Sequence, residues 1–339
     1  MKIVVQEPVF LFNKYKEDFN GYKTIFLNKH VSGIYSECPK RMVKYIIAML
    51  KNGINPFKFE YFHDSKKFNG YDVFLNLNGK PFLEFNKLPK IGSSILKAYH
   101  IMDYADKAIL SNQALCSQSI DFLFGYARHD KYCDFFNKYY TDFYRRVISV
   151  PFGYSNKYNI FDDDSERYNK VLAIGAINNI TEQDSEIIKV FPNEKYSHLL
   201  REFVRYHNSE LSFFDSFLPS KNNEKTPNVD MRRLLKSYKY FLNDLSLFNF
   251  PPARTYEGIA SGSILVGLEH DVYKELGFEN NVNCILLNEI SRVSFSNIES
   301  IIANSNKDDL VRNSMSLARE FSHDKIVSKM YNDIKNKTL

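Results

Sequence analysis

The residues best suited to chemistry lie in one stretch of the chain, residues 249–266. Pro251 and Pro252 indicate a helix start, because proline fits the first helical turn, where its missing N–H would be unpaired anyway. The free N–H groups and the dipole at such an end form an anion site that suits a pyrophosphate. Arg254 and Glu257 are three residues apart and therefore share a helix face. Arg254 could clamp a phosphate, and Glu257 could accept hydrogen bonds from both hydroxyls of a ribose.

A simpler interpretation of Arg254 and Glu257 is an ordinary ion pair on the protein surface. Such a pair stabilises a helix by only about a few tenths of a kcal/mol. Ser261 and Gly262 end the predicted helix, and a buried strand follows over residues 263–267. The sequence leaves both interpretations of the pair open at this point.

A second group of candidates lies in the first half of the chain. His100 and Asp103 stand at the end of a predicted strand, residues 95–101, where doubly wound folds place function. His100 could act as a base or hydrogen-bond a sugar, or it could be a satisfied core histidine with Asp103 capping a turn. His129 and Asp130 form a second pair of this kind in a polar stretch.

The run Asp162, Asp163 and Asp164 has the DxD pattern of a metal–nucleotide site. No strand precedes it, and the surrounding residues are polar, so a solvated linker is the favoured interpretation. The four cysteines form no CxxC pair and no zinc-like spacing with histidine. We therefore expect reduced, structural cysteines, which favour the cytoplasm.

Short apolar runs alternate with helical patterns along both halves of the chain, which is typical of parallel α/β sheets. The predicted strands of the first half cover residues 2–5, 57–62, 72–77, 95–101, 108–111 and 146–150. Those of the second half cover residues 171–175, 210–214, 238–243, 263–267 and 284–287. A strong helix signal spans residues 37–52, with Ser36 as its cap and Gly53 as its stop. Helical spacing also runs through residues 308–335.

The predicted fold class is therefore α/β, with two Rossmann-like doubly wound domains that face a cleft. The domain boundaries expected from the pattern are residues 1–154 for an N-terminal Rossmann-like domain, 155–169 for a linker and 170–320 for a C-terminal one. Residues 321–339 form a C-terminal helix, for which packing back onto the N-terminal domain is one option.

The stretch with Glu257, residues 260–262 and residues 264–266 resembles the donor-binding segment of GT-B glycosyltransferases of the group-1 (family 4-like) kind. In that family a helix with a carboxylate precedes a small-residue–glycine turn and a strand, and the carboxylate binds the nucleotide ribose. The resemblance implies this role for Glu257, with Arg254, Thr255 and Tyr256 as donor-binding neighbours. Many members carry a second glutamate where this chain has Asn249, so retention and inversion of configuration both stay open.

Further segments resemble the same family in the same order along the chain. They are residues 32–34 with the basic amphipathic helix that follows, residues 106–112, residues 147–154 and residues 171–177. The resemblance implies a Gly33 loop close to the donor phosphates or the acceptor, and it places Gly175 in the first loop of the donor domain. Four arginines are further candidates for the diphosphate, and the sequence does not choose among them: Arg201, Arg205, Arg232 and Arg233.

Charge is distributed unevenly along the chain. Residues 1–150 carry 22 Lys/Arg and 14 Asp/Glu, a net charge of +8, while the remainder carries 23 and 26, a net charge of −3. A basic N-terminal half could face anionic lipid, a phosphate-bearing acceptor or nucleic acid, or it could be an ordinary lysine-rich surface. No apolar run approaches the roughly 18 residues that a membrane span needs, and the N-terminus does not resemble a signal peptide.

The resemblance implies a glycosyltransferase that moves a sugar from a nucleotide-sugar donor to a glycan or lipid-linked acceptor, with the N-terminal domain on the acceptor side and with no metal and no other cofactor. The expected setting is bacterial surface polysaccharide or lipopolysaccharide synthesis in the cytoplasm, with peripheral association with an anionic membrane as an option. No nucleic-acid partner is expected, since no nucleic-acid motif is found. The alternatives are a nucleotide-sugar 2-epimerase on the same fold and a non-catalytic glycan- or nucleic-acid-binding protein. His100 or Asp103 would serve as the base if the reaction inverts.

Overall fold

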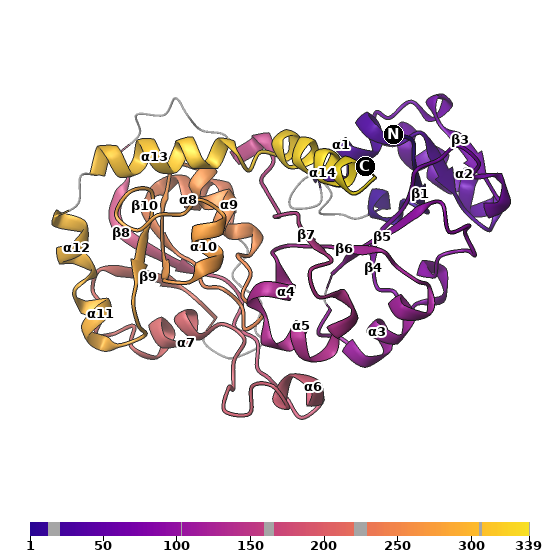
Figure 1. Cartoon of the computed structure of the whole chain (residues 1–339). Coiled ribbons are helices and arrows are strands. Elements are labelled where there is room, and N and C mark those ends of the chain that lie inside the picture. Colours follow the sequence, from indigo (N-terminus) through magenta and orange to yellow (C-terminus); the bar gives the residue numbers. More distant parts are fainter. Residues whose placement is uncertain (13–20, 103, 159–165, 220–228, 305–306, 339) are drawn as a thin grey trace. The chain divides into compact units, whose positions relative to one another are not determined.

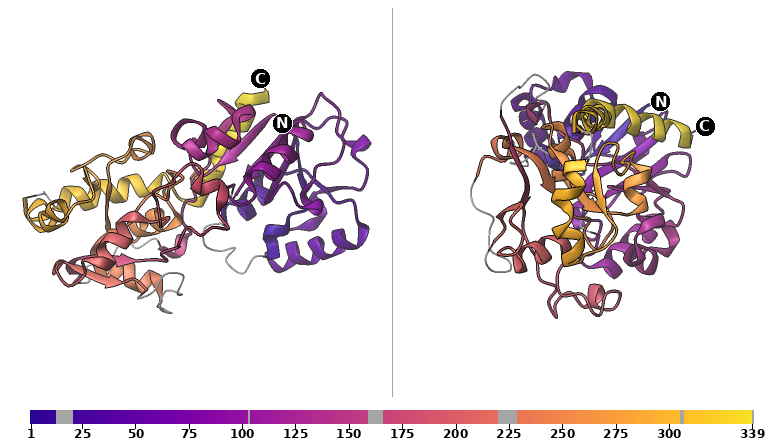
Figure 2. Two further views of the ribbon diagram at one scale, coloured as in Figure 1. Left: turned by 90° about the horizontal axis from the view of Figure 1, so that it is seen from below. Right: turned by 90° about the vertical axis from the view of Figure 1, so that its left-hand side faces the viewer.

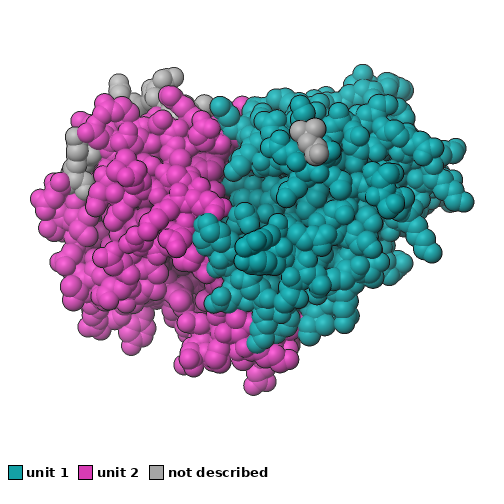
Figure 3. All heavy atoms as spheres, in the orientation of Figure 1, with its two compact units in different colours: residues 1–151, 323–339 teal, residues 152–322 magenta. Residues whose placement is uncertain are grey.

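The computed structural model describes residues 1–12, 21–102, 104–158, 166–219, 229–304 and 307–338, without the side chains of Phe85 and Lys307. The chain divides into two compact units (Figure 3): unit 1 comprises Met1–Pro151 and His323–Leu339, and unit 2 comprises Phe152–Ser322. The chain therefore leaves unit 1 after Pro151 and returns to it after Ser322. Each unit has a sheet of its own and is described by itself.

Unit 1 is built on a seven-stranded parallel sheet with the order β3-β2-β1-β4-β5-β6-β7 (Figure 1). Its strands are β1 (Ile3–Gln6), β2 (Gly33–Tyr35), β3 (Glu60–Phe62), β4 (Val73–Gly79), β5 (Leu96–Ile101), β6 (Phe122–Gly125) and β7 (Val147–Ser149). Strands β1, β2 and β6 are buried along their whole length, and β4 and β5 are buried over most of theirs, which is why such strands appear in the sequence as apolar runs. The chain winds outward in both directions from the β1–β4 pair, which is the topological switch point of this sheet.

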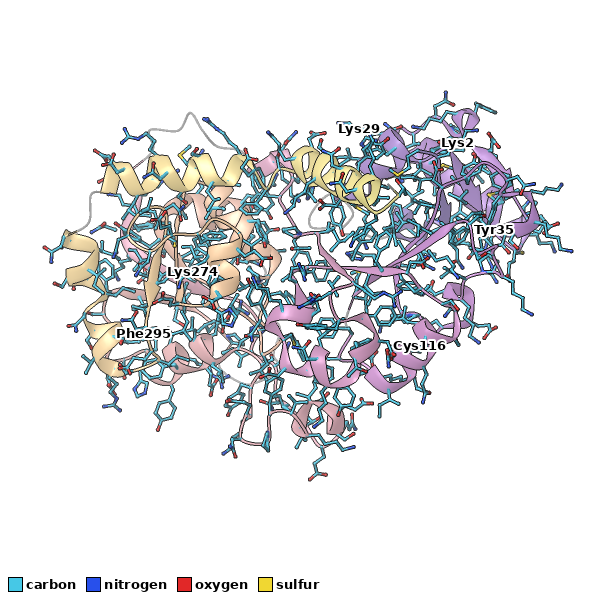
Figure 4. The ribbon with its side chains drawn as sticks, in the orientation of Figure 1. Lys2, Lys29, Tyr35, Cys116, Lys274 and Phe295 are labelled. Carbon is cyan, nitrogen blue, oxygen red and sulfur yellow. The ribbon has the colours of Figure 1, made fainter. Side chains whose placement is uncertain are left out.

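The helices of unit 1 include one that comes from the far end of the chain. They are α1 (Gly21–His30), α2 (Pro39–Lys51), α3 (Ala108–Ser117), α4 (His129–Tyr132), α5 (Asp134–Tyr139) and α14 (His323–Thr338). Helix α14 lies beside α1 (Figure 1), where Lys29 (labelled in Figure 4) pairs with Asp324 at 2.6 Å and His30 stacks on Tyr331 at 4.1 Å. The two chain ends lie near each other in every view (Figures 1 and 2).

Residues 108–111 form a helix, so the strand predicted there is wrong. Lys107 takes a left-handed conformation with φ 52° and begins α3. The strand at this place in the order is β6, Phe122–Gly125, which the sequence analysis missed. An apolar run of four residues fits one turn of a buried helix as well as a strand, and only the longer context separates the two.

Gly33 lies at the amino end of strand β2, so the predicted glycine loop is not present at this position. Its neighbours in the sheet are Val4 of β1 and Glu60 of β3. A Cβ atom on Gly33 would come within 2.8 Å of the Phe62 ring and 3.0 Å of the Tyr71 hydroxyl. The glycine is therefore required by packing against aromatic side chains, and ligands in such folds bind at the opposite, carboxyl end of the strands.

The predicted cap of helix α2 is also wrong. The cap position is Cys38, which makes no side-chain cap hydrogen bond within the described residues. Ser36 instead donates from Oγ to Glu7 Oε1 at 2.8 Å, and Glu7 also accepts from Arg41 and from the Tyr45 hydroxyl. The serine therefore helps to satisfy a buried carboxylate at the end of β1.

Unit 2 is built on a five-stranded parallel sheet with the order β12-β11-β10-β8-β9. Its strands are β8 (Tyr168–Ile174), β9 (Phe214–Phe217), β10 (Tyr238–Leu242), β11 (Ile264–Leu268) and β12 (Ile285–Leu287). The chain passes from β8 outward to β9 and then crosses back to β10, so the switch point of this sheet lies between β8 and β10. The predicted strands of the second half match these positions, except that β9 begins where the prediction of 210–214 ends.

Helices cover both faces of the unit 2 sheet (Figure 1). They are α6 (Ser185–Ile188), α7 (Leu199–Tyr206), α8 (Met231–Ser237), α9 (Ala253–Ala260), α10 (Asp271–Glu275), α11 (Arg292–Ser296), α12 (Ile298–Asn304) and α13 (Lys307–Arg319). Helices α9 and α13 pack on β11, whereas α7 packs on β8 and β9. Among the described helices of the whole chain, none combines the length and the apolar character that a membrane span requires.

Candidate functional site

The candidate site lies in unit 2, at the carboxyl ends of the two strands that flank the switch point. Strand β8 is followed by Gly175 and Ala176, and strand β10 is followed by Asn243 and Asp244. Parallel strands point their carboxyl ends toward the same edge of the sheet, so these four residues meet there. The side chain that joins them is Arg201 of helix α7.

Arg201 is a buried cation that is paired on several sides. Its Nε lies 3.1 Å from Asp244 Oδ1, one terminal nitrogen donates to the Ala176 carbonyl at 3.1 Å, and the other donates to Asn243 Oδ1 at 2.6 Å. A buried charge needs such partners, because removal from water is otherwise costly. The site therefore rests on a fixed positive group that binds both strand ends together.

Gly175 allows the Arg201 guanidinium to lie against the backbone of β8. Its φ of 137° is a backbone conformation that residues with a side chain rarely adopt. A Cβ atom at this position would come within 2.9 Å of the Arg201 Cζ. The structure thus places Gly175 at the site, but its bare backbone faces a protein side chain in this arrangement.

Asp244 is held as a carboxylate by its surroundings. Burial alone would raise its pKa, but Arg201 and His198 outweigh burial and leave the pKa of Asp244 below its usual 3.8. His198 Nδ1 lies 3.4 Å from Asp244 Oδ1, just ahead of helix α7.

Helix α7 is anchored by Phe203, whose ring lies 4.8 Å from that of Phe295, a core residue labelled in Figure 4.

The start of helix α9 lies beside this network. Thr255 Oγ1 accepts a hydrogen bond from Asn243 Nδ2 at 2.7 Å, which ties the end of β10 to the first turn of α9. Pro252 occupies the cap position without a side-chain cap hydrogen bond in the described chain. The backbone N–H groups of a helix start and its dipole favour a bound anion, so this end is suited to a phosphate group.

Arg254 and Glu257 form the predicted ion pair, but the pair is not an ordinary surface one. The Arg254 Nε lies 3.4 Å from Glu257 Oε2, and the Glu257 side chain is only 9% exposed against 26% for Arg254. Burial raises the pKa of Glu257 above its usual value, although Arg254, a hydrogen bond from Tyr158 and Lys157 act in the opposite direction. The carboxylate is therefore constrained and largely shielded from water.

Thr255 and Tyr256 serve to position α9, since both side chains are fully buried. The Tyr256 ring packs 4.8 Å from Phe321 inside unit 2. Of the four candidate arginines, Arg201 lies at the site. Arg205 pairs with Glu202 on the same helix, and Arg232 and Arg233 stand in the first turn of α8, capped by Asp230.

His100 and His129 are core histidines of unit 1. His100 on β5 is fully buried, and its Nε2 lies 3.0 Å from the Tyr22 hydroxyl. Burial, with Lys23 and His129 nearby, holds the pKa of His100 well below its usual 6.5, so the ring is neutral. Its Nδ1 has no hydrogen-bond partner among the residues described. Burial lowers the pKa of His129 to about 3.

The remaining acidic candidates divide into two groups. Asp130 is buried and accepts two hydrogen bonds from Arg128, at 2.9 and 3.0 Å, so it has a structural role beside His129. Asp103 and the run Asp162, Asp163 and Asp164 lie outside the described residues.

Gly258 is a site residue that the sequence analysis missed. It lies in helix α9, and a Cβ atom there would come within 2.3 Å of the Phe241 ring on β10. The helix can approach the sheet closely only because this residue is glycine. A glycine within a predicted helix, one residue after Glu257, was the available signal, because a helical glycine is unfavourable unless packing requires it.

The Gly258→Ala variant is expected to destabilise unit 2 by about 1–3 kcal/mol, the usual effect of overpacking. Because Phe241 is fully buried, its ring cannot move away from the new Cβ atom. The resulting steric strain outweighs the better helix propensity of alanine. Differential scanning calorimetry measures the change. The matched control is Gly92→Ala, where the nearest atom to a new Cβ is 4.0 Å away; equal effects of the two substitutions would contradict the packing argument.

Comparison with known proteins connects this architecture to solved structures. No family model matches the sequence, and no curated protein gives a significant match. Sucrose-phosphate synthase from Thermosynechococcus elongatus is similar over 99% of this chain and 98% of its own, with 9% identity and a TM-score of 0.58. HepE (Alr3699) of Anabaena, solved with UDP, is similar over 99% and 100%, with 10% identity and a TM-score of 0.56.

Two further solved structures differ in how much of their length is matched. A glycosyltransferase from Rickettsia africae is similar over 99% of this chain and 98% of its own, with 11% identity and a TM-score of 0.51. The chain spans only 56% of the pneumococcal O-GlcNAc transferase GtfA, with 14% identity and a TM-score of 0.43. At these identities the likeness concerns the fold, and the chain has the GT-B fold, with two Rossmann-like α/β units, as the sequence predicted.

Proposed function

We propose that the chain is a glycosyltransferase that takes a sugar from a nucleotide-sugar donor held in unit 2. The observation that carries the proposal is the shielded Arg254–Glu257 pair at the start of α9, beside the switch point between β8 and β10. In this proposal Glu257 accepts hydrogen bonds from the ribose hydroxyls. Arg254 and the N–H groups of the helix start bind the diphosphate.

The comparisons support a nucleotide sugar as the donor class. HepE, which shares the fold along the whole chain, was solved with UDP and with UDP-glucose. The proposal assigns neutralisation of the leaving diphosphate to Arg254 and the α9 dipole, so it includes no metal. Uridine nucleotides are accordingly the first donors to test.

The proposed acceptor is a glycan or lipid-linked molecule, and its binding is assigned to unit 1. The net charge of +8 over residues 1–150 supports an anionic acceptor or one at an anionic membrane. Bacterial surface polysaccharide or lipopolysaccharide synthesis on the cytoplasmic side is the setting we propose. His100 and Asp103 stay candidates for a base, but the full burial of His100 and its lowered pKa make its ring a weak base.

A thermal-shift experiment tests the donor site. UDP and UDP-sugars are expected to raise the melting temperature of the purified chain by several degrees at saturating concentration, since a ligand that binds only the native state stabilises it by mass action. Uridine and inorganic pyrophosphate, each lacking half of the proposed contacts, serve as controls. A cooperative melt that no nucleoside diphosphate or nucleotide sugar shifts would refute the donor site.

Product analysis with donor alone then separates transfer from 2-epimerisation, because only an epimerase converts the donor without an acceptor.

A further inference from the structure

Helix α2 of unit 1 carries two apolar faces, although a surface helix ordinarily needs one. The buried face consists of Met42, Tyr45, Ala48 and Met49. A second set, Val43, Ile47 and Leu50, recurs at intervals of four and three residues and is 56%, 48% and 57% exposed. These three side chains form a stripe along the helix that the described protein does not cover.

Two further exposed aromatic side chains stand on 3-10 helices next to α2. Phe12 of η1 (Val9–Phe12) is half-exposed, and its ring lies 5.7 Å from that of Tyr45 on α2. Phe57 of η2 (Pro56–Lys58) is 89% exposed. Both short helices pack against α2. Because Tyr45 belongs to the buried face of α2, Phe12 does not extend the stripe, and we refer to the three exposed side chains of the stripe as the apolar face: Val43, Ile47 and Leu50.

The charged residues of the segment that carries the apolar face have a single sign. Residues 39–58 contain five basic residues and no Asp or Glu. Arg41 is engaged by the buried Glu7, and Lys58 donates to Asn28. Helical spacing places the exposed Lys40, Lys44 and Lys51 in a row along one side of the stripe.

Unit 1 also contains a pocket that no residue of the apolar face lines. Phe12 lines this pocket of about 320 Å³ at the carboxyl end of β4, whose other walls include Phe10, Leu77 and Met102. Asn78 adds a polar wall, and its Oδ1 has no hydrogen-bond partner among the described residues.

We propose that the apolar face docks on an anionic lipid bilayer, with α2 lying in the plane of the interface. Interfacial helices combine large apolar side chains with a lysine-rich flank, which contacts anionic headgroups while the apolar side chains enter the acyl boundary. The lysine row, in a segment (residues 39–58) that contains no Asp or Glu, favours an anionic lipid surface over a protein partner. The proposal goes beyond the donor site and does not depend on it.

Vesicle flotation tests this docking surface directly. The full chain is expected to float with phosphatidylcholine vesicles that contain phosphatidylglycerol, to remain in solution with phosphatidylcholine alone, and to be released by high salt, which screens the lysines. The variants Ile47→Ser/Leu50→Ser and Lys40→Glu/Lys44→Glu should each reduce binding about tenfold or more. All four side chains are exposed, so the melting temperature should stay that of the wild type.

Matched controls come from the same unit. Ile109→Ser/Leu110→Ser on α3 removes an equally exposed apolar pair, and Lys325→Glu/Lys329→Glu on α14 reverses two exposed lysines with the same spacing. Both controls should bind vesicles as the wild type does. The proposal is overturned if the wild type does not float, if the controls lose binding as the α2 variants do, or if the α2 variants keep it. Concentration-dependent self-association that only Ile47→Ser/Leu50→Ser abolishes, without vesicle binding, would identify the face as a protein interface instead.

Discussion

Replacement of Arg201 by methionine is expected to destabilise unit 2 by about 3–5 kcal/mol, the usual effect of removing one partner from a buried ion pair. The Arg201 side chain is 6% exposed and that of Asp244 is 3% exposed, so neither charge can turn to water. Without the guanidinium, Asp244 stays buried with His198 as its remaining ion-pair partner, and Asn243 Oδ1 loses its donor. Calorimetry and circular dichroism can follow the unfolding, since the chain has no tryptophan for fluorescence.

The control for Arg201→Met lies one turn further along the same helix. Arg205 pairs with Glu202 where both side chains are partly exposed, so Arg205→Met should change stability by less than about 1 kcal/mol. The double variant Arg201→Met/Asp244→Asn removes the unpaired charge and should recover at least half of the loss. If the double variant loses as much free energy of unfolding as the two single variants together, Arg201 does not act by charge pairing.

The pH dependence of Arg201→Met follows from the pKa of Asp244. In the native protein this pKa lies below the unfolded value, so Asp244 contributes stability above the unfolded pKa that is lost as pH falls through the folded one. Without Arg201, burial prevails and the folded pKa rises above the unfolded value. On acidification the variant then gains stability relative to the wild type. The difference in the free energy of unfolding between wild type and variant should therefore become smaller toward low pH.

Buried parallel strands were the part of the fold that the sequence predicted well. Strands such as β4, β10 and β11 are buried on both faces and therefore appear as continuous apolar runs between polar breaks. The same signal failed at residues 108–111, because a four-residue apolar run does not distinguish a strand from a helical turn. It also missed β6, whose short sequence, Phe-Leu-Phe-Gly, carries little pattern.

The candidate site was predictable only where its residues are neighbours in sequence. Arg254 and Glu257 share a helix turn, so their pairing follows from helical spacing. Arg201 and Asp244 are 43 residues apart and meet because β8 and β10 are adjacent in the sheet. Nothing in a single sequence states that adjacency, so Arg201 was one of four equal candidates and Asp244 was not considered. The polar pair Asn243 and Asp244 directly after an apolar strand was the available signal.

Replacement of Glu257 by alanine is expected to weaken nucleotide-sugar binding about 10- to 100-fold, the range for hydrogen bonds to a charged group. In the proposed wild-type complex, this carboxylate accepts hydrogen bonds from the ribose hydroxyls at the start of α9. Isothermal titration of UDP and a UDP-sugar measures the change. Glu299→Ala, an exposed glutamate on α12, is the control and should bind as the wild type does. Unchanged affinity in Glu257→Ala would refute the ribose assignment.

The affinity of the wild type should also depend on pH through Glu257. Burial raises the pKa of this carboxyl in the free protein, so on acidification it takes up a proton at a higher pH than an ordinary glutamate with a pKa of 4.5. A protonated carboxyl loses the charge that the ribose hydroxyls would contact, so donor binding should weaken as pH falls through that raised value. Glu257→Ala has no such group and should lack this step.

Deoxy nucleotides separate a ribose contact from a merely structural role of Glu257. If the carboxylate holds the ribose, removing the 2′- or 3′-hydroxyl from the ligand should weaken binding to the wild type but add little in Glu257→Ala, because both changes remove the same hydrogen bond. If Glu257 instead only neutralises Arg254, both proteins should discriminate equally against the deoxy ligand. The two changes, Glu257→Ala and removal of a ribose hydroxyl, form a double-mutant cycle. The interaction energy between the two changes decides which role Glu257 has.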